Sequence, residues 1–123
     1  GVQTCALPIY WVVTKAYFNF DVHNMSGSSL DKTGVQKKFT QKKGYTIPYG
    51  CFVPLKVENL YLAGRDISGT HMAHSNYRVM PICANMGLAV GVAASLCVKT
   101  GCTPRKLQAA DVQKRLTELG VTP

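Results

Sequence analysis

The sequence predicts an α/β fold, in the form of an α+β fragment with a strand–loop–helix unit at its centre. Residues 10–22 are rich in aromatic and β-branched side chains that alternate with polar ones, as in a half-buried strand. Residues 59–63 form a short apolar run that ends at Gly64, which is typical of a buried strand leaving its sheet. Residues 80–98 carry no charged side chain and are long enough for a helix.

Composition limits the chain to one modest packed domain. Of 123 residues, 46% are hydrophobic and 16% are charged, which excludes a disordered or collagen-like chain. The 14 Lys and Arg outnumber the 6 Asp and Glu, for a net charge of +8. Such a balance favours acidic partners, among them phosphate-bearing cofactors, nucleic acid and anionic membranes.

The cysteines and the start of the chain indicate its setting. The five cysteines are odd in number and form no C-x-x-C pair, so their spacing predicts no zinc ribbon, iron–sulfur cluster or disulfide framework. We expect free thiols, a reducing compartment and a cytoplasmic location. Residues 1–9 resemble a translated sequencing-library adapter, and we expect them to be non-native. The chain is then expected to be an internal or C-terminal piece.

The segments before the apolar run have loop and extended character. Residues 23–44 hold three glycines and five lysines, which is loop composition. The lysines between 32 and 43 could contact a phosphate polymer or a membrane surface, or simply form a solvated face. Residues 45–57 contain Pro48 and Pro54, which favours an edge strand or a clamped extended segment.

The predicted helix covers about 81–99. Pro81 suits its first turn, and Gly101 suits its carboxyl-terminal cap. A small-residue stripe along this helix predicts a close neighbour, either the sheet of a packed core or a second helix in a membrane. The stripe consists of Ala84, Gly87, Gly91 and Ala94, and we expect it to be buried.

A second helical stretch begins near Thr103 and Pro104. It is amphipathic through Val112, Leu116 and Leu119, with Gly120 as its stop.

The chemistry is expected where the strand 59–63 meets the helix. The first amides of a helix lack intrahelical partners, and Met80 cannot cap them, so an electron-rich ligand atom is a natural substitute. Gly64 would let a ligand pass against the backbone, and Arg65 and Arg78 bracket the intervening loop as partners for phosphate or carbonyl groups.

Motifs over this stretch carry a family resemblance. They are I-P-Y ahead of V-P, N-L-x-x-A-G-R, A-H-x-x-x-R-V-M-P and G-x-x-x-G-x-A-A. From about Tyr45 to Leu119 the chain resembles the C-terminal, FAD-contacting segment of FAD-dependent oxidoreductases of the heterodisulfide-reductase-subunit-A-like group. More weakly, residues 17–27 resemble the substrate-domain strand that precedes this segment.

The resemblance implies the C-terminal part of a two-domain, Rossmann-like flavoprotein that transfers a hydride between a small-molecule substrate and FAD. Residues 10–50 would be a remnant of the substrate domain and 51–123 part of the FAD-binding domain. We expect no nucleic-acid or membrane partner. Some relatives carry a 4Fe-4S cluster, for which this sequence shows no ligands, and the dinucleotide fingerprint G-x-G-x-x-G is absent. The residues implied to contact FAD are Ala63, Gly64, Arg65, Asp66, Met80, Pro81, Ile82 and Cys83.

Two further side chains are candidates for catalysis. His74, like His71 in the same loop, could protonate or orient a substrate, or could be a loop histidine bonded to backbone. Arg78 would suit an anionic flavin or an acidic substrate, or could clamp the loop. Two histidines without a third ligand do not predict a metal site. Cys83 is interpreted as a packed small residue, because no second cysteine is placed to pair with it.

Overall fold

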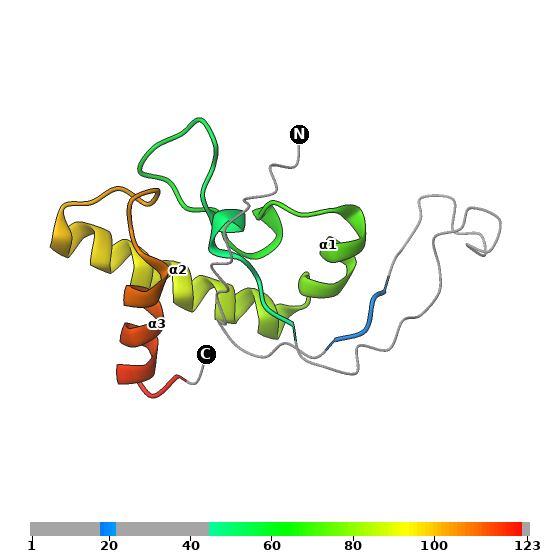
Figure 1. Cartoon of the computed structure of the whole chain (residues 1–123). Coiled ribbons are helices and arrows are strands. Elements are labelled where there is room, and N and C mark those ends of the chain that lie inside the picture. The colour runs from blue at the N-terminus through cyan, green and yellow to red at the C-terminus, as the bar shows by residue number, and fades with distance from the viewer. Residues whose placement is uncertain (1–17, 22–44, 122–123) are drawn as a thin grey trace.

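The computed structural model describes residues 18–21 and 45–121. In this part of the chain, two 3₁₀ turns, η2 (Tyr49–Phe52) and η3 (Gly64–Asp66), precede the helices α1 (His71–Tyr77), α2 (Met80–Thr100) and α3 (Ala109–Glu118). Figure 1 shows α2 running across the molecule, with α3 beside it and α1 near its amino end. The expected basic segment 32–43 and most of the expected strand 10–22 lie outside the described residues.

The ends of α2 follow the signals in the sequence. Pro81 lies in its first turn, where a missing N–H removes no intrahelical bond. Gly101 ends the helix in the left-handed conformation, with φ of 69°. The helix predicted over 81–99 is therefore confirmed.

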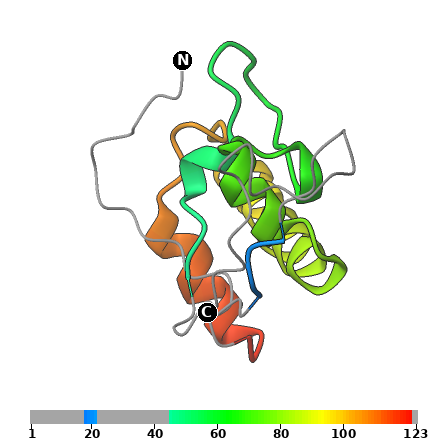
Figure 2. The same cartoon turned by 90° about the vertical axis from the view of Figure 1, so that its right-hand side faces the viewer.

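One core holds the described elements together, and α2 supplies its largest share. The buried α2 side chains pack with Phe52 of η2 and with Val112 and Leu116 of α3. Figure 2 shows the segment 45–52 passing between α3 and α1. The buried residues of α2 are Ile82, Met86, Ala89, Val92, Ala93 and Cys97.

The small-residue stripe is not buried, so that prediction is wrong for this structure. Ala84, Gly87 and Gly91 are exposed and Ala94 is half-buried. A Cβ placed on either glycine would meet nothing within 4 Å. The opposite face of α2, with Ile82, Met86 and Val92 as its largest buried side chains, packs into the core instead.

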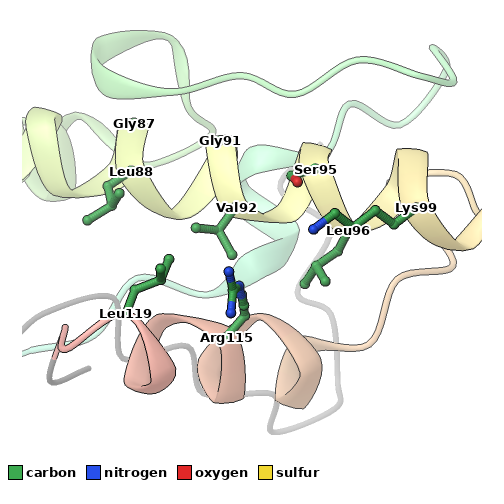
Figure 3. Close-up of a pocket in the computed structure, with 9 residues that line it drawn as sticks. All are labelled: Gly87, Leu88, Gly91, Val92, Ser95, Leu96, Lys99, Arg115 and Leu119. Carbon is green, nitrogen blue, oxygen red and sulfur yellow. The ribbon is translucent and has the colours of Figure 1, made fainter.

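The exposed glycines instead line a groove between α2 and α3. It has a volume of about 400 Å³. Figure 3 shows Leu88 and Leu119 near one end of the groove, and Lys99 and Arg115 projecting into its other part.

The strand predicted at 59–63 does not form. The described residues contain no strand, although Ala63 has extended backbone angles and the Leu62 N–H donates to Phe52 O at 2.8 Å. Asn59 interrupts the run with φ of 56°. A strand is defined by a ladder to a neighbour, and no described segment supplies one. The described part is mostly helical, and most of the other expected strand, 10–22, lies outside it, so the α/β class stays a prediction.

Two further details of the fold differ from expectation. Residues 71–77, expected to be irregular, form α1, whose first turn is capped by Thr70 Oγ1 accepting from the Ala73 N–H at 3.1 Å. Leu119 lies past the end of α3 and is 51% exposed, whereas Val112 and Leu116 are buried as predicted. Gly120 stops the helix with φ of 79°, also as predicted.

Length and apolar composition would also allow α2 to cross a bilayer. A buried helix of a soluble protein meets the same criterion.

We predict that Leu116→Ala lowers the free energy of unfolding by about 2–5 kcal/mol, because it leaves a cavity in the core. Leu116 is fully buried and Leu119 is 51% exposed, so Leu119→Ala, three residues further along the chain, is the matched control, with a loss below about 0.5 kcal/mol. Chemical denaturation measures both. Equal losses for the two variants would contradict the packing of α3.

Candidate functional site

The structure brings the two predicted cofactor-binding segments together. A Cβ built on Gly64 would lie 3.8 Å from Cys83 Cβ and 3.9 Å from Cys83 Sγ. The turn η3 therefore lies directly against the first turn of α2. Residues 63–66 and 80–83, separated in sequence by α1, form one surface.

Gly64 makes this approach possible through its backbone. Ala63 is extended, and the chain then reverses at Gly64, which has φ of 65°. This left-handed conformation strains any residue with a Cβ. The Asp66 N–H closes the turn by donating to Ala63 O at 3.4 Å. Arg65 and Asp66 are exposed on the outer side of the turn.

The amino end of α2 has backbone donors that no side chain caps. Its cap residue, Val79, makes no side-chain cap bond, and Met80 is 77% exposed. The Cys83 N–H already donates to Val79 O at 3.0 Å, which leaves the amides of Met80 and Ile82 without intrahelical acceptors. The helix dipole makes this end favourable for an electron-rich atom. The Ile82 side chain points into the core and anchors the turn.

His74 ties α1 to the Gly64 turn. Its Nε2 lies 2.8 Å from Arg65 O, and its ring packs edge-on against Tyr77 with centroids 5.2 Å apart. Because a carbonyl only accepts, Nε2 must carry a proton in this bond, and Nδ1 of the neutral ring is then the acceptor. A second bond joins the same two elements, because Arg65 Nε donates to the carbonyl of Arg78, the cap residue at the end of α1, at 3.2 Å. The histidine is thus bonded to backbone, one of the two interpretations open from the sequence.

Arg78 lies in an ion pair that links two parts of the chain. Its Nη2 donates to Asp21 Oδ2 at 3.0 Å and lies 3.3 Å from Asp21 O. Next to it, Asn76 Nδ2 donates to Phe18 O. Both contacts fasten residues 18–21 to the carboxyl end of α1. The Arg78 side chain is 34% exposed and that of Asp21 is 42% exposed, so solvent screens the pair.

Sequence reasoning missed Tyr77 as the residue that shapes the loop. A Cβ on Gly69 would lie 2.2 Å from Tyr77 Oη, so the ring occupies space that only a glycine leaves. Burial raises the pKa of Tyr77, which keeps its hydroxyl protonated.

The helix cap at Thr70, three residues ahead of Ala73, was the available signal for α1. His71 is exposed on α1, and the described residues bring no three metal ligands together.

Comparison with known proteins identifies the family. The model of the family described as FAD dependent oxidoreductase matches residues 12–116, which is most of the 123-residue chain. No curated protein and no solved structure matches the chain. The match spans both the Gly64 turn and the first turn of α2. The chain therefore belongs to the FAD dependent oxidoreductase family.

Proposed function

We propose that the chain is the C-terminal portion of a flavoprotein oxidoreductase that transfers a hydride between a small-molecule substrate and FAD. The observation that carries this proposal is the contact between the Gly64 turn and the first turn of α2. In this proposal residues 10–50 belong to the substrate domain and 51–123 to the FAD-binding domain, whose Rossmann-like form is implied by the family. The proposed location is cytoplasmic.

The residues at this contact suit part of a flavin. FAD, when bound, supplies the carrier for the hydride. In this proposal the isoalloxazine or ribityl chain passes the backbone at Gly64, where the left-handed φ of 65° turns the chain beside Cys83. The free amide of Ile82 can donate to an electron-rich carbonyl at the pyrimidine edge of the ring. Ala63, Arg65, Asp66, Met80, Pro81 and Cys83 complete the proposed surface.

The proposed surface is incomplete for the whole cofactor. The dinucleotide fingerprint G-x-G-x-x-G, which holds the ADP half through backbone amides, is absent from the sequence. A longer protein must supply that half. We place this protein in the heterodisulfide-reductase-subunit-A-like group on the motifs of residues 45–119, and assign no iron–sulfur ligands to the chain.

His74 and Arg78 have proposed roles beside the flavin. His74 would hold the Gly64 turn in place through Arg65 O and present Nδ1 as an acceptor for a substrate proton. Arg78 would act on the flavin through its charge, which Asp21 partly neutralises at 3.0 Å.

We predict that the 123-residue chain alone does not retain FAD. One turn and one helix end supply too few contacts to offset the entropy lost on binding. Titration with FAD, followed by flavin fluorescence, should show no saturable quenching at micromolar concentration. Stoichiometric binding would mean that the fragment assignment is wrong.

We also predict opposite outcomes for Gly87→Leu in two settings. In the chain alone the substitution should be tolerated, because a Cβ at Gly87 meets nothing within 4 Å. In the full-length flavoprotein we propose that a further segment covers the groove; the added side chain would then overpack that segment and reduce FAD content. Thermal unfolding and the flavin-to-protein absorbance ratio measure the two effects. Unchanged FAD content would contradict the covering of this groove.

A third prediction tests the charge of Arg78 in the full-length flavoprotein. Arg78→Ala removes a cation and should lower the flavin midpoint potential by up to about 30 mV, or about 1.4 kcal/mol for two electrons. Asp21→Asn is the matched variant and should raise the potential, because it leaves Arg78 unneutralised. Spectroelectrochemistry measures both. If both potentials stay at the wild-type value while substrate KM rises, Arg78 belongs to the substrate pocket.

A further inference from the structure

Two cysteine thiols meet at the carboxyl end of α2, far along the helix from the Gly64 turn. Cys97 lies in the last turns of α2 and Cys102 follows its end. Their sulfur atoms are 3.8 Å apart, with the Cys102 thiol donating to Cys97 Sγ. This distance is van der Waals contact, so no atom separates the two sulfurs.

The helix ending produces this contact. Gly101 reverses the chain with φ of 69°, and the Cys102 N–H then donates to Cys97 O at 3.2 Å. This is the 6→1 bond of a Schellman ending, which holds residues five apart beside each other. A disulfide has an S–S bond of 2.03–2.05 Å, so the sulfurs must approach by about 1.8 Å from 3.8 Å. Rotations about the two χ1 angles can supply a movement of this size.

The two thiols have different surroundings. Cys97 is 8% exposed and lies 3.4 Å from the hydroxyl of Tyr61. Burial raises the pKa of the Cys97 thiol. Cys102 is half-buried, and the hydroxyl of Thr100 lies 3.2 Å from its sulfur. A reagent in solution can therefore react with Cys102, whereas the buried Cys97 is in contact with the sulfur of Cys102.

We propose that Cys97 and Cys102 form a reversible disulfide by exchange with a small disulfide of the glutathione class. The Cys102 thiolate attacks one sulfur of oxidised glutathione, which forms a mixed disulfide and releases one glutathione thiolate. The Cys97 thiolate then attacks the Cys102 sulfur, which forms the internal bond and releases the second. The two cysteines lose two electrons and two protons, and one glutathione disulfide becomes two thiols. This inference does not depend on the proposed function.

The disulfide would also change a tyrosine network. Tyr61 Oη lies 2.5 Å from Tyr49 Oη, and Tyr49 Oη donates to Pro104 O at 2.7 Å. Oxidation replaces the Cys97 thiol, which lies 3.4 Å from the Tyr61 hydroxyl, by a disulfide sulfur. The hydrogen bonds that join Tyr61 to Tyr49 and Pro104 would then change as well.

Mass spectrometry of the full chain tests the proposal. The chain is incubated with oxidised glutathione, alkylated and cleaved with trypsin after Arg78, Lys99 and Arg105. Cys97 and Cys102 then fall in separate peptides, 79–99 and 100–105. We expect these peptides to be linked, with the loss of two hydrogens. Because peptide 79–99 also holds Cys83, the Cys83→Ser variant is the control and should give the same link.

Two variants resolve the order of the steps. Cys97→Ser should stop at the mixed disulfide on Cys102 and accumulate it at least about tenfold above wild type, because no second thiol displaces glutathione. Cys102→Ser should leave Cys97 free, since its thiol is buried. Equal mixed disulfide in wild type and Cys97→Ser would overturn the proposal. So would thiols at Cys97 and Cys102 that remain alkylatable after unfolding of the treated wild-type chain, a result that needs no variant to fold.

Discussion

The buried face of α2 is the constraint on which the rest of the described structure depends. Met86 and Ala93 on this face pack with Phe52, Val112 and Leu116 in one cluster. This cluster holds both α3 and the turn η2 against the buried face of α2. The Gly64 turn also lies against α2, at its first turn. With α2 in place, the candidate cofactor surface at its amino end and the thiol pair at its carboxyl end are positioned by the same helix.

At both ends of α2 a glycine adopts the left-handed conformation, which strains a residue that has a Cβ. Gly64 reverses the chain beside Cys83 with φ of 65°, and Gly101 reverses it beside Cys97 with φ of 69°. The reversal at Gly64 brings η3 against the first turn of α2, with α1 lying between them in sequence. The reversal at Gly101 brings Cys102 against Cys97, five residues earlier. At the amino end, bonds from Arg65 and His74 hold α1 and the turn as one frame. The geometry of the proposed site thus rests on the Gly64 backbone and on two side-chain bonds to main-chain carbonyls.

Three helix ends could be predicted from the sequence, but the start of α3, expected near Thr103, lies at Ala109, and α1 was not predicted. The orientation of the helices could not be predicted either. Pro81, Gly101 and Gly120 act through local backbone geometry, so their positions predict where α2 and α3 begin or end. The buried face of α2 depends on tertiary neighbours, and the stripe of Ala84, Gly87 and Gly91 misled the prediction. Strand 59–63 failed for the same reason, because a ladder requires a partner that no described segment provides. The family resemblance implied that Gly64 and Cys83 both contact FAD and so lie near each other. The packing of Tyr77 against Gly69 and the contact between Cys97 and Cys102 depend on tertiary structure and could not be predicted.

The exposed glycines of α2 pose an energetic question that bears on the proposed function. Each glycine inside a helix destabilises it by about 0.5–1 kcal/mol relative to alanine. In the described structure nothing lies within 4 Å of a Cβ at Gly87 or Gly91, so no contact offsets this cost. A stretch of backbone packed into the groove would offset it, since a glycine surface allows closer approach than any other. Under the proposed function, in which the chain is part of a longer flavoprotein, a further segment of that protein would be such a neighbour.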